Sequence, residues 1–177
     1  MIGDQIRPGS AGLPGSWALL VPALMLTALV AACGSSTPTV EEGQAAGFEL
    51  ITYDGRQLSL GDLDGQAVVL NFWATWCAPC RTEMPHFEST YREYKQRGVV
   101  FVGVAMADDP DASKSFLREL NITYPNGPDD DSEISSRYGA VGLPTTVFIG
   151  RDGKMARTWA GAIDKERLVA LVEEIAR

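Results

Sequence analysis

From Phe48 onward, apolar positions follow two periods along the chain, one typical of strands and one typical of helices. Short runs that alternate apolar and polar residues predict half-buried strands, whereas the continuous run 68–70 predicts a strand that is covered on both faces. Asp54-Gly55 and Asp152-Gly153 are tight-turn signals, so the strands on either side of each turn should form a hairpin. The expected strands are 48–53, 57–60, 66–74, 99–106, 145–149 and 155–159.

Helical spacing marks the segments between and after these strands. Met84, Phe87 and Tyr91 recur at helical intervals, and Gly98 suits the end of their helix. Asp109-Pro110 reads as a helix start, because Asp caps helices and Pro fits the first turn. Further helices are expected over 132–138 and from about residue 164. Strands that alternate with helices and end in a hairpin predict an α/β fold with a mixed sheet covered on both faces.

The N-terminal segment departs from this pattern. Residues 17–32 are apolar and uncharged, but they are fewer than the about twenty residues that a membrane-spanning helix needs. Small residues stand directly before Cys33, as they do before the cleavage site of a secretory signal. The arrangement resembles the bacterial lipoprotein signal, which implies that Cys33 is lipidated and becomes the mature N-terminus. An uncleaved anchor and an ordinary cleaved signal are the alternatives, and all three place the protein outside the cytoplasm.

Three regions are therefore expected along the chain. Residues 1–32 form the signal peptide, and residues 33–47, which are small, polar and unpatterned, form a flexible tether. Residues 48–177 have the length of one domain. Lipid on Cys33 would hold this domain at the outer face of the cytoplasmic membrane.

Charge and cysteine content narrow the possible functions. The net charge is −8, and Lys and Arg form no cluster, which argues against nucleic acid as a partner. The acidic run 129–131 with Glu133 is expected to be a solvated loop, with an acidic docking patch as the alternative. The three cysteines leave no set of structural disulfides, so the domain depends on its apolar core.

Cys77 and Cys80 lie where a buried strand gives way to a helix. At this spacing in a first helical turn, two sulfurs can reach disulfide distance. Unpaired backbone N–H groups and the helix dipole favour a thiolate at the first sulfur. Because the thiolate is the nucleophile in disulfide exchange, we expect Cys77 to be the exposed attacking sulfur and Cys80 to resolve the mixed disulfide.

A C-x-x-C pair has two other uses, half of a zinc site and a purely structural disulfide. Structural zinc takes four N, S or O ligands, and His86 is the chain's single histidine. A strand-to-helix position in an α/β pattern favours redox use over a structural bond. We therefore expect no metal and no cofactor.

Two separated motifs resemble those of TlpA-like and ResA-like thioredoxins. The first is residues 68–85, VVLNFWATWCAPCRTEMP, and the second is residues 142–149, GLPTTVFI, followed by Asp152-Gly153-Lys154. The likeness runs from about Phe48 to the C-terminus, and residues 109–128 would supply the helix–strand unit by which this family exceeds plain thioredoxin. It implies a thioredoxin-like fold and a membrane-tethered thiol reductase. Several members of the family serve cytochrome c maturation.

This resemblance also implies partners. They are protein disulfide substrates, among which apocytochrome c fits the family, and a membrane electron donor. The chain is expected to act as a monomer.

Further site residues follow from the same resemblance. Pro144 maps onto the family's cis-proline, which faces the cysteines and helps to hold an extended substrate segment, and Leu143 and Thr145 would flank that groove. Apart from the resemblance, the large aromatic residues Trp73 and Trp76 are candidates for a substrate-facing apolar rim, although one of them should pack in the core.

Two polar residues complete the predicted site. Glu83, one helical turn after Cys80, maps onto an acidic residue that the family keeps near the active site. It is expected to exchange protons with Cys80 or to tune Cys77, with a solvated helix residue as the alternative. Asn71 occupies the place of the buried aspartate of plain thioredoxins and cannot act as a base. His86 is expected to be an ordinary helix-surface residue.

Two other functions remain as alternatives. A peroxiredoxin-like thiol peroxidase would carry a Pro-x-x-x-Thr-x-x approach to its cysteine, which the residues ahead of Cys77 do not fit. A non-enzymatic copper carrier of the envelope would use a wider C-x-x-x-C pair and a distant histidine. The spacing of the sulfurs therefore favours thiol–disulfide exchange, and the uncharged Ala78 and Pro79 between them favour the reducing direction.

Overall fold

The structure is a computed structural model that describes residues 43–177. The predicted signal peptide, Cys33 and most of the predicted tether lie outside the described residues. Within residues 43–177, no helix combines the length and the apolar character that crossing a membrane requires.

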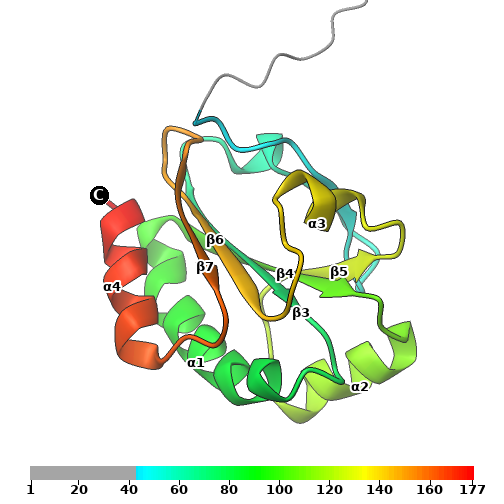
Figure 1. Ribbon diagram of the computed structural model, residues 1–177. Coiled ribbons are helices and arrows are strands. Elements are labelled where there is room, and N and C mark those ends of the chain that lie inside the picture. The colour runs from blue at the N-terminus through cyan, green and yellow to red at the C-terminus, as the bar shows by residue number, and fades with distance from the viewer. Residues whose placement is uncertain (1–42) are drawn as a thin grey trace, which may run out of the picture. The chain divides into compact units, whose positions relative to one another are not determined.

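A five-stranded mixed sheet forms the centre of the domain (Figure 1). Its strand order is β5-β4-β3-β6-β7. The central strand β3 runs parallel to β4 and antiparallel to β6, and the outer strands β5 and β7 pair with β4 and β6. The bounds are β3 Ala67–Trp73, β4 Val99–Met106, β5 Asn126–Asp129, β6 Thr145–Ile149 and β7 Met155–Ala160.

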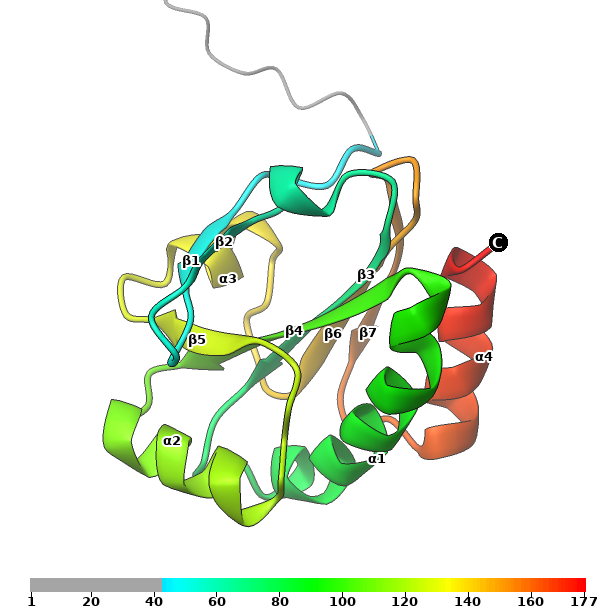
Figure 2. The same cartoon turned by 180° about the vertical axis from the view of Figure 1, so that it is seen from behind.

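Helices and a hairpin cover the two faces of this sheet (Figures 1 and 2). Helices α1 and α4 pack side by side on one face, and α2 shares their apolar core. The short helix α3 and the antiparallel hairpin β1–β2 lie on the other face. The bounds are β1 Glu49–Ile51, β2 Gln57–Ser59, α1 Ala78–Tyr94, α2 Pro110–Glu119, α3 Glu133–Arg137 and α4 Lys165–Ile175, with 3₁₀ turns at Gly61–Leu63 and Lys95–Arg97.

Strand β3 is buried along its whole length, as its continuous apolar run predicts. Successive strand residues face opposite sides of a sheet, so Val69 and Trp73 join the core beneath α1 and α4. Leu70 and Phe72 join the second core, beneath α3 and the hairpin. Asn71 is the one polar residue of this strand, and the alternation places it on the α1 side.

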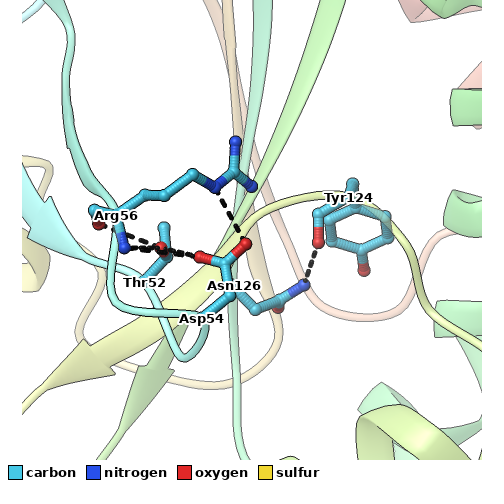
Figure 3. A network of polar contacts seen from close by, with 5 residues as sticks. All are labelled: Thr52, Asp54, Arg56, Tyr124 and Asn126. Carbon is cyan, nitrogen blue, oxygen red and sulfur yellow. Dashed lines mark hydrogen bonds and ion pairs between the residues drawn. The ribbon is translucent and has the colours of Figure 1, made fainter.

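Strand β5 was not predicted by the residue pattern, although the family resemblance implied a helix–strand unit in this region. Its four residues are Asn, Gly, Pro and Asp, which are typical of turns. Close packing of the hairpin accounts for the glycine, because a Cβ on Gly127 would lie 2.5 Å from the carbonyl oxygen of Ile51. Asn126 is buried and donates to the Tyr124 carbonyl oxygen at 2.9 Å, close to the hydrogen-bonded turn that follows β1 (Figure 3).

The acidic run 129–131 was expected to be a solvated loop, and this expectation is wrong at Asp129. This side chain is buried and accepts hydrogen bonds from the backbone N–H groups of Ile134 at 3.0 Å and Ser135 at 2.9 Å. Asp129 therefore satisfies the N–H groups of the second and third residues of α3, whereas Asp130, Asp131 and Glu133 are exposed.

The folded part begins a few residues ahead of Phe48. Gln44 forms a β-bridge with Lys154, and the Ala45 N–H group donates to the Gly153 carbonyl oxygen at 2.9 Å. The Tyr138 hydroxyl donates to the Ala46 carbonyl oxygen. These contacts hold the C-terminal end of the predicted tether against the β6–β7 turn and α3.

Candidate active site

The redox pair lies at the C-terminal end of β3, where the chain turns into α1. Cys77 and Cys80 form a disulfide, with 5.3 Å between their Cα atoms. Cys77 caps α1, and its sulfur accepts a hydrogen bond from the Cys80 backbone N–H group at 3.3 Å. A thiolate released at Cys77 would thus face the positive end of the helix dipole.

The two sulfurs differ less in exposure than the sequence predicts. In the disulfide, Cys77 is 5% exposed and Cys80 is fully buried, so Cys77 is the more accessible of the two cysteines but is not exposed as expected. Ala78 and Pro79, which lie between the cysteines, are exposed. The exposed surface next to Cys77 is therefore formed in part by two uncharged residues.

The predicted proline loop meets the cysteines at one edge of the sheet. The Leu143–Pro144 peptide bond is cis, as expected. Thr145 opens β6 opposite Phe72 of β3, so Pro144 lies near the strand end that leads to Cys77. Thr145 is buried and its hydroxyl donates to the Gly142 carbonyl oxygen at 2.7 Å, so this hydroxyl is engaged within the loop.

Exposed apolar side chains lie both on the segment before Cys77 and on the loop before Pro144. Trp76 is 64% exposed, and its indole N–H donates to the Ala107 carbonyl oxygen at 3.1 Å. Trp73 is the tryptophan that packs in the core, where its indole N–H donates to Asn126 Oδ1 at 2.9 Å. Val141, which the sequence analysis did not single out, is fully exposed three residues before Pro144. Its position directly ahead of the second motif was the available signal.

Glu83 is buried on α1, one turn after Cys80, and not solvated. Its carboxylate accepts from Asn71 Nδ2 at 3.2 Å and from the Ile163 backbone N–H at 3.0 Å. Burial raises the pKa of Glu83 to about 7, although both hydrogen bonds act in the opposite direction. A carboxyl group with this pKa can give and take a proton near neutral pH.

Asn71 connects Glu83 to β6, the strand that follows Pro144. Its Nδ2 also donates to Thr146 Oγ1 at 3.2 Å, across the pairing of β3 with β6, while its buried Oδ1 has no hydrogen-bond partner among the described residues. Thr146 and Ile163 were not foreseen. Thr146 could have been found by pairing the strand of the first motif with the strand of the second. Ile163 contributes only its backbone N–H group, which no residue pattern identifies.

His86 lies on α1, half-buried, well beyond the first turn that carries the cysteines. Among residues 43–177, no group of three or more His, Cys, Asp and Glu side chains is arranged to hold a metal ion.

Comparison with known proteins agrees with this geometry. Residues 42–158 match the model of the AhpC/TSA family. The chain is 34% identical over 132 residues to the thiol-disulfide oxidoreductase ResA of Bacillus thuringiensis subsp. konkukian (strain 97-27), covering 75% of this chain and 76% of the relative. It is 31% identical over 150 residues to ResA of Bacillus subtilis (strain 168), covering 85% and 84%.

Solved structures give the same result. A thiol:disulfide interchange protein of the thioredoxin family from Chlorobium tepidum TLS superposes with a TM-score of 0.72 at 28% identity, over 76% of this chain and 97% of the other. A secreted Mycobacterium tuberculosis disulfide oxidoreductase homologous to E. coli DsbE superposes with a TM-score of 0.66 at 29% identity, over 72% and 95%. The thioredoxin-like fold is thus confirmed, and the chain belongs to the AhpC/TSA family as a ResA-like thiol–disulfide oxidoreductase that works through the Cys77–Cys80 disulfide.

Proposed function

We propose that this protein reduces disulfides of other proteins outside the cytoplasm, anchored to the membrane by lipid on Cys33. One observation carries the reducing direction: the Cys77 sulfur caps α1 beside the uncharged Ala78 and Pro79, so the helix end and the Cys80 backbone N–H group supply most of the stabilisation of its thiolate. Equilibration of the protein with redox buffers tests that direction. Apocytochrome c is one substrate of suitable chemistry.

The exchange proceeds in two steps that conserve electrons. The Cys77 thiolate attacks one sulfur of the substrate disulfide, forms a mixed disulfide and releases the other substrate sulfur as a thiolate. The Cys80 thiolate then attacks the Cys77 sulfur, which releases the second substrate thiol and leaves the Cys77–Cys80 disulfide. A membrane dithiol donor restores the two electrons.

Glu83 supplies the base for the second step in this proposal. Cys80 is fully buried and must lose a proton before it can attack, and Glu83 lies one helical turn away with a pKa near 7. The Asn71 amide suits both forms of Glu83. Its Nδ2 donates to the carboxylate, and after a half-turn of the amide its Oδ1 would accept from the protonated carboxyl group.

Glu83→Gln should make the free energy of unfolding less dependent on pH. Because the folded pKa is raised from 4.5 to about 7, the contribution of Glu83 to stability should be fully present below pH 4.5 and should be lost as the pH rises through 7. The ionised form should cost on the order of 3 kcal/mol, at 1.36 kcal/mol per pKa unit. Denaturant titrations of both proteins between pH 4 and pH 8.5 measure the difference.

Glu88→Gln is the matched control on the same helix. Burial acts to raise the pKa of Glu88, but hydrogen bonds from Thr123 and pairing with Arg92 prevail, so the pKa is lowered. This variant should therefore lose stability at neutral pH, and the loss should shrink as the pH falls towards the pKa of Glu88. If Glu83→Gln follows the wild-type pH profile, Glu83 is not the proton-exchanging group.

The substrate groove is proposed to lie between the two motifs. Trp76 and Val141 offer apolar surface on its two sides, and Leu143 and Pro144 lie in the loop that leads to Thr145, the first residue of β6. An extended substrate segment would run along this loop with its disulfide over Cys77. Trapping partners with a Cys80→Ser variant in the native cell envelope would identify the substrates.

The lipid anchor makes a separate prediction. Cys33 should carry lipid at the N-terminus of the mature protein, and Cys33→Ser should yield no lipidated form. Intact-mass analysis of protein purified from membranes measures this directly. A mature N-terminus elsewhere, with unmodified Cys33, would instead indicate an ordinary signal or an uncleaved anchor.

A further inference from the structure

The loop between β4 and α2 holds the segment that precedes Cys77. The Asp108 carboxylate accepts four hydrogen bonds, two of them from Thr75. Its Oδ2 accepts from the Thr75 backbone N–H at 2.6 Å and from Ser113 Oγ at 2.9 Å. Its Oδ1 accepts from Thr75 Oγ1 at 2.6 Å and from the Asp109 backbone N–H at 3.1 Å.

The residue before Asp108 holds the next position of the same segment. The Ala107 carbonyl oxygen accepts from the Trp76 indole N–H at 3.1 Å, although the Trp76 side chain is 64% exposed. Ala107 has a φ of 47°, a left-handed conformation that is disfavoured for a residue with a Cβ. A backbone conformation of this kind persists where surrounding contacts enforce it. Thr75 and Trp76 are thus both fixed from one loop.

The hydrogen bonds at Asp108 require a carboxylate. Each of its two oxygens accepts from a backbone N–H group, one belonging to Thr75 and the other to Asp109. An asparagine in either amide orientation would point its NH₂ group at one of these donors. The geometry therefore requires aspartate at this position, whereas an ordinary loop position would accept any polar residue.

We propose that Asp108 is a positioning residue for disulfide exchange. Through Thr75 it fixes the strand-to-helix connection, and it acts together with the Ala107 carbonyl group on Trp76. Cys77 and the exposed indole are then presented to a substrate in one fixed arrangement. The proposal rests on the thiol–disulfide oxidoreductase activity of this chain and does not depend on which direction the reaction takes in the cell.

Asp108→Ala tests the proposal in the full-length protein. With a peptide that contains one intramolecular disulfide as substrate, and dithiothreitol as the dithiol that returns Cys77 and Cys80 to the reduced form, kcat/KM should fall on the order of tenfold or more, because a misplacement of about 1 Å can cost on the order of a hundredfold. Alkylation of Cys77 by iodoacetamide, which needs no docking, should stay within about twofold of the wild-type rate at each pH. A loss confined to the docked substrate identifies positioning, since general unfolding would alter both reactions.

Asp109→Ala is the matched control. Asp109 is the adjacent exposed carboxylate and caps α2 by accepting from the backbone N–H groups of Asp111 and Ala112, with no bond to Thr75 or Trp76. It should lower stability but leave kcat/KM within about twofold of wild type. An equal loss of activity in Asp108→Ala and Asp109→Ala would overturn the proposal.

Thr75→Val provides a milder variant in case Asp108→Ala does not fold. It removes one hydroxyl bond to Asp108 and retains the backbone bond, so its loss of kcat/KM should be smaller. Because the two residues act as a unit, the Asp108→Ala/Thr75→Val double variant should be no worse than Asp108→Ala alone. Losses that multiply would overturn the proposal, whereas a wild-type protein inactive on the peptide would count against the proposed function instead.

Discussion

Cys77→Ser should abolish disulfide exchange, while Cys80→Ser should retain the first step and accumulate mixed disulfides. The reason lies in the two positions. Cys77 caps α1 and is the less buried sulfur, whereas Cys80 is enclosed within the first turn of the helix. A serine hydroxyl at position 77 cannot attack a disulfide at neutral pH, because it offers no thiolate. In Cys80→Ser, the mixed disulfide at Cys77 has no internal sulfur to resolve it.

Both variants can be compared in one assay. The reduced protein is mixed with a disulfide peptide, quenched with acid, and separated by mass into free and peptide-bound forms. A Cys33→Ser background removes the third cysteine from the measurement.

Alkylation near neutral pH should modify Cys77 much faster than Cys80 in the reduced wild-type protein. Equal rates at the two sulfurs would reverse or remove the assignment of roles.

The pattern of apolar residues predicts most of this fold because most elements obey one local rule. Continuous burial of β3 and β4 leaves long apolar runs, Asp109 caps α2 as predicted, and α4 begins directly after Asp164, close to the predicted position. Strand β5 escapes detection because close packing against the hairpin selects glycine at Gly127. Asp129 is misjudged for a similar reason, since it accepts hydrogen bonds from α3 residues that lie five and six positions further along the chain.

The site is predictable where chemistry fixes residue type and spacing together. The spacing of Cys77 and Cys80 at a strand-to-helix junction indicates their chemistry by itself, whereas the cis bond at Pro144 and the place of Glu83 near the cysteines were expected from the family resemblance. Asp108 and Thr146 contribute through contacts with residues far away in the chain. No local spacing encodes such contacts, and any residue type except proline could supply the N–H group of Ile163.

The reduction potential of the purified protein should lie nearer the thioredoxin value of about −270 mV than the strong-oxidant value of about −120 mV. A strongly oxidising protein stabilises its reduced form by holding the thiolate tightly. Here Ala78 and Pro79 carry no charge, and the Cys77 sulfur accepts one hydrogen bond, from the Cys80 N–H group at 3.3 Å. Ionised Glu83 would further disfavour a thiolate nearby, because like charges raise the pKa of a thiol.

The two cases differ by about 150 mV, which for two electrons is roughly 7 kcal/mol, so equilibration with glutathione or dithiothreitol buffers distinguishes them. Pro79→His supplies a matched comparison at an exposed position of the first helical turn. A protonated imidazole there would stabilise the Cys77 thiolate, so this variant should have a potential above that of wild type, while Pro79→Ser should stay close to it. A wild-type potential above about −180 mV would mean that the protein is poised as an isomerase or an oxidant. The assignment as a reductase would then be wrong, although the roles of Cys77 and Cys80 would stand.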